Sequence, residues 1–269
     1  MNKLCMKAMG QWIKAVAQTG QRQWALLNGA WLFYTCLPVP RNWPVQFGQI
    51  ARVAPIVGAG LGGCQATIDW GLGLGIPLFL RSVLVVLAGL WLTGGLHLDG
   101  AMDTADGLAV QDDQRRLQVM ADSNAGAFGA MVAIAILLLK VAALTSISHT
   151  RWFALIAAAA WGRWGQQWAI GNYAYLKPQG KGAFHKQAIP SPWYTLPCAG
   201  GLGVLTIVGV GMKWVTWQYG VVTAAVGIGS AVLVASWLNH RLGGHTGDTY
   251  GAVVEWVEVA VLVGLACVG

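Results

Sequence analysis

Long uncharged runs of apolar residues are the feature that most constrains this chain. A membrane-spanning helix needs about 20 consecutive, mostly apolar residues, and several runs reach that length once their small and aromatic flanks are included. Charged residues make up only 10% of the chain, whereas soluble domains contain about 25%. The sequence therefore predicts an all-α, polytopic membrane helical bundle with about seven or eight membrane-embedded helices. The runs cover residues 53–68, 82–96, 125–139, 152–162, 194–212, 217–239 and 259–269.

The N-terminal segment differs from the rest of the chain. Residues 1–24 contain no acid, and their apolar residues and lysines separate onto two helical faces. This pattern predicts an interfacial amphipathic segment. Residues 25–269 then form a single transmembrane domain. Its first apolar stretch, 25–39, is short for a span and ends in a segment with Pro38 and Pro40, so we expect a re-entrant or half-spanning element there.

Lysines and arginines predict the orientation in the membrane. Twelve of the seventeen fall in the N-terminal segment and in four polar loops, and only Arg81, Arg151 and Lys213 fall in the short opposite loops. Cytoplasmic loops of membrane proteins carry such an excess of basic residues. We therefore expect the polar loops on the cytoplasmic face. They cover residues 41–52, 98–124, 172–193 and 239–249.

Six of the chain's ten carboxylates lie between Trp91 and Asp122. Asp99, Asp103 and Asp106 have the spacing i, i+4, i+7, so they share one face if the helix that begins near Arg81 continues through them. Three adjacent anions repel one another unless a cation lies between them. Mg²⁺ takes oxygen ligands and often bridges carboxylates to phosphate. The spacing predicts a Mg²⁺ site for phosphoryl-type chemistry.

A solvated acidic loop that balances Arg115 and Arg116 is the alternative. It accounts well for Asp112 and Asp113. It accounts poorly for the three spaced aspartates, which are interleaved with small residues that let a ligand approach the backbone. His97 precedes them and suits a base or a phosphate contact, although a structural role fits equally well.

Two further segments carry candidate residues. Residues 239–248 contain glycine pairs and His245, and lead into Asp248 and Glu255, which share a helical face. Such a turn can face an anion, and carboxylates within a span usually mark function. An ion pair with Lys140 or Arg163 is the alternative for the acids. The loop at 172–186 contains Lys177 and Lys181 among its basic residues. A bound phosphate would explain these lysines, and so would the general excess of basic residues in cytoplasmic loops.

Three ordered motifs resemble the cobalamin synthase family, also called adenosylcobinamide-GDP ribazoletransferases. They are GLHLDGAMDTADGL at 95–108, RRLQVMADSNAGAFG at 115–129 and GGHTGDTYGAVVEWVE at 243–258. LPVP at 37–40 and YLKPQGKG at 175–182 are also similar to segments of that family, so the resemblance extends over most of the chain.

The resemblance implies a Mg²⁺-dependent enzyme of the cell inner membrane whose active site faces the cytoplasm. Such an enzyme joins α-ribazole, or its 5′-phosphate, to adenosylcobinamide-GDP and releases GMP, so residues 25–269 would be a catalytic domain. It implies the two substrates and the lipid bilayer as partners and no nucleic acid, and it is compatible with a homo-oligomer or a pathway complex. The residues expected to act in catalysis are Asp99, Asp103, Asp106, Asp122, Asp248 and His97, the first three as metal ligands.

The chain departs from the family pattern at two positions. Cys36 stands where a basic residue usually precedes LPVP, and Asn124 stands where the family has the arginine of a DSR tripeptide. Other basic residues must then contact the nucleotide. The residues expected to bind substrate are Arg41, Arg115, Arg116, Lys177, Lys181, His245 and Glu255.

Two other classes of function remain open from the sequence. A CDP-alcohol phosphotransferase also places aspartates on helices at the membrane face, but Asp103 stands where its signature has alanine. An ion-coupled carrier would use charged residues at membrane depth, such as Asp69, Lys140 and Glu255. Carriers usually have paired halves, and the sequence contains no such internal symmetry.

Overall fold

The computed structural model describes residues 3–122, 124–177 and 182–268. This part of the chain is a helical bundle, and its one β feature is an isolated bridge. The all-α membrane bundle predicted from the sequence is confirmed. Its elements are α1 (Lys3–Tyr34), η1 (Ile50–Val53), α2 (Ala54–Leu72), α3 (Leu78–Leu92), α4 (Leu96–Ala109), α5 (Asp113–Val119), α6 (Ala127–Ser146), α7 (Arg151–Asn172), α8 (Ala183–Ala188), η2 (Pro192–Thr195), α9 (Leu196–Gly211), α10 (Trp217–Leu242) and α11 (Gly247–Ala266).

Helix α7 forms the centre of the bundle. It buries most of its residues, and it packs against α2, α10 and α11. Small residues bring α2 and α7 unusually close, since an added Cβ at Gly58 would lie 2.4 Å from the carbonyl oxygen of Ala159. Gly62 faces the backbone of Ile156 in the same way. Close backbone approach through small residues is typical of helix pairs inside membranes.

Four helices in the described chain are long and apolar enough to cross a membrane, namely α6, the η2–α9 segment (Pro192–Gly211), α10 and α11. The bent pair α3–α4 makes a fifth candidate if it counts as one broken span. The predicted count of seven or eight exceeds this number. Helices α2 and α7 account for part of the difference. Both carry buried charged residues that contact protein rather than lipid, namely Asp69 in α2 and Arg163 in α7.

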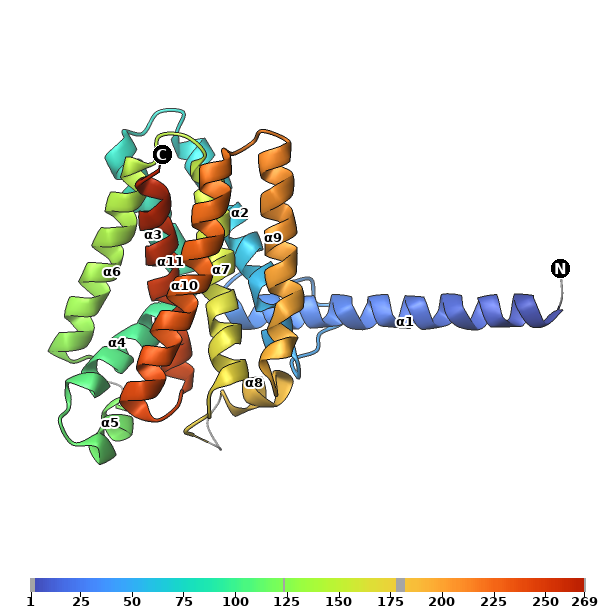
Figure 1. Cartoon of the computed structure of the whole chain (residues 1–269), viewed down its shortest axis with the longest axis horizontal. Helices are drawn as coiled ribbons and strands as arrows, with labels where there is room; N and C mark the ends of the chain where they lie inside the picture. The colour runs from blue at the N-terminus through green and yellow to red at the C-terminus, as the bar shows by residue number, and fades with distance from the viewer. Residues whose placement is uncertain (1–2, 123, 178–181, 269) are drawn as a thin grey trace.

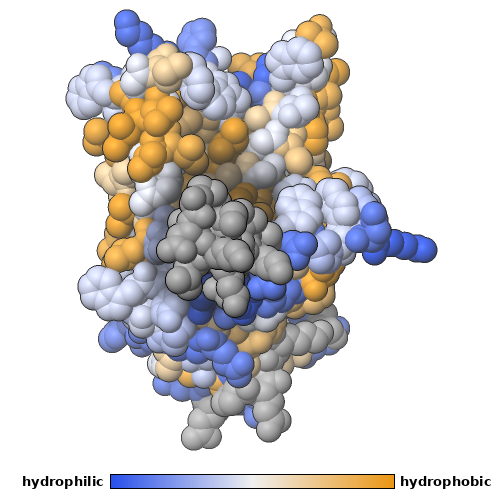
Figure 2. All heavy atoms as spheres, turned by 90° about the vertical axis from the view of Figure 1, so that its right-hand side faces the viewer, coloured by the Kyte–Doolittle hydropathy of each residue, from blue (hydrophilic) through white to orange (hydrophobic). Residues whose placement is uncertain are grey.

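The outer surface supports a membrane location. Leu138, Ile207 and Leu233 are more than half exposed on α6, α9 and α10, where water would disfavour them. In Figure 2 apolar side chains concentrate in the upper part of the visible face, and hydrophilic ones gather in the lower part. Trp152 and Trp217 lie exposed at helix starts, which fits interfacial anchoring.

Helix α3 does not continue through the aspartates, so the expectation of one continuous helix is wrong. The chain turns by 88° between α3 and α4. Gly94 and Gly95 have φ angles of 61° and 74°, a left-handed conformation that glycine adopts without a steric penalty. Helix α4 therefore runs obliquely to the long helices in the lower part of the bundle, where it packs against α6 and α11 (Figure 1).

Helix α1 extends without a break across the predicted boundary at residues 24 and 25 and ends at Tyr34, before the TCLPVP segment. Figure 1 shows its N-terminal part pointing away from the bundle, crosswise to the long helices. The division into an interfacial segment and a transmembrane domain stays a prediction.

The polar loops expected to share one side of the bundle do lie together. Helices α4, α5 and α8 gather at its lower end in Figure 1. Hydrogen bonds connect these regions: Arg52 donates to the carbonyl of Ala188, and Arg116 donates to that of Arg241.

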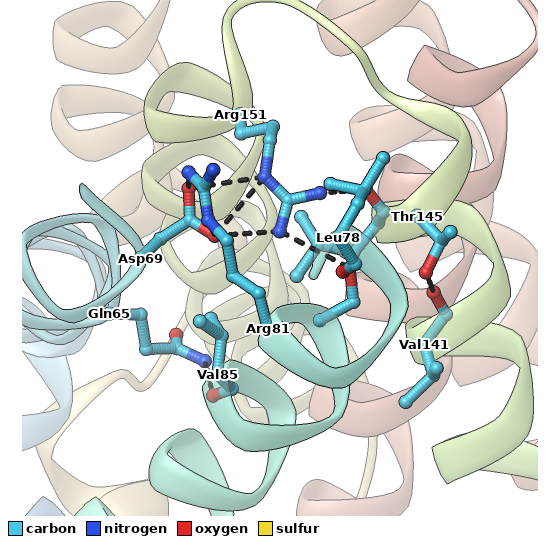
Figure 3. A network of polar contacts seen from close by, with 10 residues as sticks. Gln65, Asp69, Leu78, Arg81, Val85, Val141, Thr145 and Arg151 are labelled. Atoms are coloured by element: carbon cyan, nitrogen blue, oxygen red, sulfur yellow. Dashed lines mark hydrogen bonds and ion pairs between the residues drawn. The ribbon is translucent and has the colours of Figure 1, made fainter. Parts of the chain in front are cut away.

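The opposite end is held by a buried ion-pair network (Figure 3). Asp69 of α2 accepts hydrogen bonds from Arg151 of α7, with a Nη2–Oδ1 distance of 2.6 Å, and from Arg81 of α3. Arg151 also donates to Ser82 at 3.2 Å. A buried charge is tolerated when it is paired and hydrogen-bonded. The carboxylate of Asp69 therefore joins the ends of three helices.

Candidate active site

A close crossing of α4 and α11 builds the acidic site. An added Cβ at Gly100 would lie 2.6 Å from the carbonyl oxygen of Asp248, and one at Gly251 would lie 2.9 Å from that of His97. Only glycine allows the two backbones to approach this closely. The crossing brings Asp99 and the first turn of α11 to one pocket.

Asp103 is the electrostatic centre of the carboxylates. Partial burial, followed by the charges of Asp99, Asp248 and Asp106, raises the pKa of Asp103 to about 6, and Lys177 opposes this rise. The repulsion predicted from the i, i+4, i+7 spacing therefore exists in the fold, and Asp248 from the second motif adds to it. A cation among these groups would relieve the repulsion.

Two distant motif loops pair to position Asp248. The His245 amide donates to the carbonyl of Ala174 and the Leu176 amide donates to the carbonyl of His245, both at 2.8 Å. Thr246 caps α11 and donates to Asp248 Oδ2 at 3.1 Å. Lys177 lies 3.2 Å from the same oxygen. The predicted substrate contact Lys177 thus lies within the site as a partner of a candidate catalytic acid.

Asp106 has a different environment from the other two spaced aspartates. Its two carboxylate oxygens accept hydrogen bonds from the backbone amides of Gly126 and Gly129, each at 2.8 Å. These amides belong to the start of α6, where unpaired N–H groups and the helix dipole favour an anion. Asp106 therefore anchors α6 to α4, and its role as a metal ligand stays a prediction.

Other predicted residues lie at the edge of the site or have structural partners. Arg116 donates to the carbonyls of Val110 and Arg241 and pairs with Asp113. Asp122 is exposed, and its Oδ1 accepts a hydrogen bond from the side chain of Asn124 at 2.8 Å. Arg41 and Arg115 are exposed, and Lys181 lies outside the described residues.

Glu255 belongs to a buried ion-pair network instead of the open site. Lys140 of α6 lies 2.6 Å from Glu255 and 2.5 Å from Glu258, and Arg163 of α7 also pairs with Glu258. For Glu255, the alternative interpretation of an ion pair with Lys140 inside the bundle is the arrangement found, whereas Asp248 pairs with Lys177. This network reaches the site through His97, whose Nδ1 lies 3.5 Å from Arg163 Nη2.

His245 also has internal partners on both ring nitrogens. Nδ1 lies 3.0 Å from Thr249 Oγ1, and Nε2 lies 3.1 Å from the carbonyl of Ala235. Burial lowers the pKa of His245 to about 4, so the ring is neutral near pH 7. Its contacts fix the turn that carries Asp248.

The carboxylate oxygens of the site suit a hard divalent cation whose remaining ligands come from the substrate. No three His, Cys, Asp or Glu side chains in the described chain converge closely enough to hold a metal ion by themselves. Mg²⁺ is usually held by one or two carboxylates, with phosphate oxygens and water as its other ligands. Asp99, Asp103 and Asp248 supply only oxygen donors, and the charges of Asp99 and Asp248 contribute to the raised pKa of Asp103. Phosphate oxygens of a substrate would supply the missing ligands.

One part of the site was not predicted from the sequence. A pocket of about 260 Å³ extends from the acids into the bundle, and we call it the aromatic pocket. Its residues come from elements far apart in the chain, and no motif spacing links them. It is lined by Phe33, Tyr34, His97, Asp99, Gln166, His185, Asp248 and Tyr250, with Leu96 and four glycines.

Comparison with known families identifies this arrangement of motifs. The description "Cobalamin-5-phosphate synthase" belongs to a family model that matches residues 26–266. The chain belongs to the cobalamin-5-phosphate synthase family. That match contains all the described acids of the site and the aromatic pocket. It decides against the CDP-alcohol phosphotransferase and the carrier.

Relatives named adenosylcobinamide-GDP ribazoletransferase align over most of their length. The one from Trichormus variabilis is 55% identical over 236 residues, which cover 86% of this chain and 92% of the relative. The one from Synechococcus elongatus is 48% identical over 241 residues, covering 89% and 95%. The one from Synechocystis is 46% identical over 262 residues, covering 92% and 98%. No solved structure matches the chain.

Proposed function

We propose that this membrane protein is an adenosylcobinamide-GDP ribazoletransferase. It joins α-ribazole, or its 5′-phosphate, to adenosylcobinamide-GDP, and forms adenosylcobalamin, or its 5′-phosphate, and GMP late in cobalamin biosynthesis. Family membership over residues 26–266 supports this reaction. The observation that carries it is the pocket of about 260 Å³ that Asp99 and Asp248 both line, with Asp103 one helical turn along α4 from Asp99.

The reaction is a displacement at phosphorus. A ribose hydroxyl of α-ribazole attacks the phosphorus attached to the corrinoid side chain, a new P–O bond forms, and the P–O bond to GMP breaks. The hydroxyl proton passes to a carboxylate of the site. Such a reaction requires positioning and charge neutralisation more than covalent catalysis. Lys177, next to Asp248, contributes a positive charge near the phosphates.

We propose Mg²⁺ as the cofactor, held by Asp99 and Asp103 together with Asp248. When bound, the ion neutralises negative charge on the phosphates. The α4–α11 crossing, where Gly100 contacts the backbone of Asp248, would bring these carboxylates to the ion. Asp106, which is bonded to the start of α6, keeps α4 in register with that helix.

The proposed location is the cell inner membrane, with the active site facing the cytoplasm. The excess of basic residues in the loops at the acidic end supports this orientation.

A direct assay tests the proposed function. Detergent-purified protein is incubated with adenosylcobinamide-GDP, α-ribazole and Mg²⁺, and GMP and the cobalamin product are quantified by mass spectrometry. We expect both products in equal amounts. Replacing adenosylcobinamide-GDP with CDP-diacylglycerol should give no product. GMP release without a cobalamin product, or no release at all, would contradict the proposal.

A further inference from the structure

The aromatic pocket contains several buried polar atoms that lack a partner in the protein. His97 Nε2, His185 Nδ1 and the hydroxyl of Tyr250 have no hydrogen bond. Gln166 Oε1 and the hydroxyl of Tyr34 likewise have no hydrogen-bond partner. All five residues are at most 4% exposed. Buried polar groups are normally paired, because an unpaired one costs about 1–3 kcal/mol. So many unpaired groups in one pocket indicate a polar ligand.

The walls of this pocket suit a flat ring. The rings of His97 and His185 both stack on Tyr34, each with a centroid distance of 6.2 Å. Phe33 meets His185 edge to face. Burial lowers the pKa of His185 to about 4, so this ring is neutral near pH 7 and offers one N–H donor and one acceptor nitrogen. Aromatic walls of this kind favour a planar heterocycle over a sugar or an alkyl chain.

We propose that the aromatic pocket binds the guanine base of adenosylcobinamide-GDP and of the released GMP. This assignment rests on the proposed function and says which substrate part occupies which space. Guanine has N–H donors at N1 and N2 and acceptors at O6 and N7, so it can satisfy several of the unpaired atoms at once. The benzimidazole of α-ribazole offers one bare ring nitrogen and an apolar edge, and it would leave most of them unpaired.

The position of the pocket agrees with this assignment. Asp99 and Asp248 line its mouth, whereas Tyr34, Gln166 and His185 are contributed by α1, α7 and α8. A guanine held among the aromatic residues directs the attached pyrophosphate toward the two carboxylates. α-Ribazole must then approach from the other side of the acids. A second, wider groove also reaches Asp99, and its lining includes Cys36, Gly95 and Met102.

Two substitutions test the assignment through binding of GMP to the purified full-length protein. Tyr250→Phe removes only a hydroxyl, and Gln166→Leu removes the amide. Each should weaken GMP binding about three- to tenfold in calorimetry, because each removes one hydrogen bond, and should leave α-ribazole affinity unchanged. The wild type should bind IMP, which lacks the 2-amino group, more weakly than GMP. Tyr219→Phe is the matched control, since Tyr219 is a buried tyrosine that does not line the pocket.

Stability measurements keep the test independent of misfolding. The hydroxyl of Tyr250 has no partner in the protein, so Tyr250→Phe should not lower the Tm. Wild-type GMP affinity in both variants, or weaker α-ribazole binding in its place, would overturn the assignment. GMP binding does not depend on turnover. If the variants weaken GMP binding as expected but the wild type makes no cobalamin product, the base pocket stands and the proposed function fails.

Discussion

At the scale of single residues, identical side chains in one motif have different roles. Asp99, Asp103 and Asp106 have the spacing of one helical face, and α4 does present all three. Their oxygens nevertheless meet different partners, because the α6 amides bind Asp106. The carboxylate cluster was predictable from the sequence. The different role of Asp106 was not predictable, since the amides that bind it lie 20 or more residues away in the sequence, at the start of α6.

The raised pKa of Asp103 gives a stability prediction. A folded-state pKa of about 6, above the ordinary value of 3.8, means that the folded protein holds this proton more tightly than the unfolded chain. Stability contributed by this group is present at low pH and is lost as the pH rises through 6. In metal-free buffer, Asp103→Asn should therefore raise the Tm at pH 7.5 and change it little near pH 4.

Differential scanning fluorimetry of the detergent-solubilised protein across this pH range makes the measurement. Asp113→Asn is the control, because the Asp113 side chain is 80% exposed and pairs only with Arg116 among the described contacts. A pH-independent Tm difference for Asp103→Asn would show that the carboxylates do not repel one another in the folded protein.

At the scale of helices, glycines decide where the site forms. Gly94 and Gly95 end α3 and redirect α4, whereas Gly100 and Gly251 let α4 and α11 touch. The sequence analysis did not predict this break, since it expected one helix to continue from Arg81 through the aspartates. The 88° angle of the turn was not predictable either, because it depends on how α4 packs against α6 and α11.

Gly100→Ala should impair the site by separating α4 and α11. Its Cβ would lie 2.6 Å from a backbone oxygen of Asp248, and overpacking of this kind costs about 1–3 kcal/mol. We expect a lower Tm and reduced turnover. Gly63→Ala in the interior of α2 is the matched control, since its Cβ meets nothing within 4 Å. Equal turnover in the two variants would show that the close crossing is not needed for activity.

The network of Lys140, Glu255 and Glu258 predicts a large effect on folding. Lys140→Met would leave two buried carboxylates with one fewer cation, and breaking a buried ion pair typically costs about 3–5 kcal/mol. The Tm should fall strongly, and adding Glu255→Gln should restore part of it. Arg115→Met, at an exposed position, should change the Tm little. A normal Tm for Lys140→Met would mean that the network does not hold α6 to α11.

At the scale of the whole molecule, composition predicted the class of fold, and the number of spans was less predictable. Hydropathy finds helices that face lipid, such as α6 and α9. It fails for α7, which carries Arg151 and Arg163 and is surrounded by protein. Similarly, the aromatic pocket was missed because Tyr34 and His185 become neighbours only when distant segments pack together.

The proposed orientation can be tested in intact cells. In a variant that lacks the five native cysteines, we introduce Lys213→Cys or Arg115→Cys and label with a membrane-impermeant maleimide. The residue between α9 and α10 should react from outside the inner membrane, and the residue in α5 should react only after lysis. The reverse labelling pattern would place the acidic end on the outer side.

The proposal that Asp103 helps to bind a catalytic Mg²⁺ is tested most directly by the Mg²⁺ dependence of GMP release. The wild type, Asp103→Asn and Asp113→Asn are compared under identical conditions. We expect Mg²⁺-dependent release by the wild type and Asp113→Asn, and a loss of at least about 100-fold in Asp103→Asn, comparable to removal of one strong electrostatic contact. Wild-type release by Asp103→Asn at limiting Mg²⁺ would contradict it.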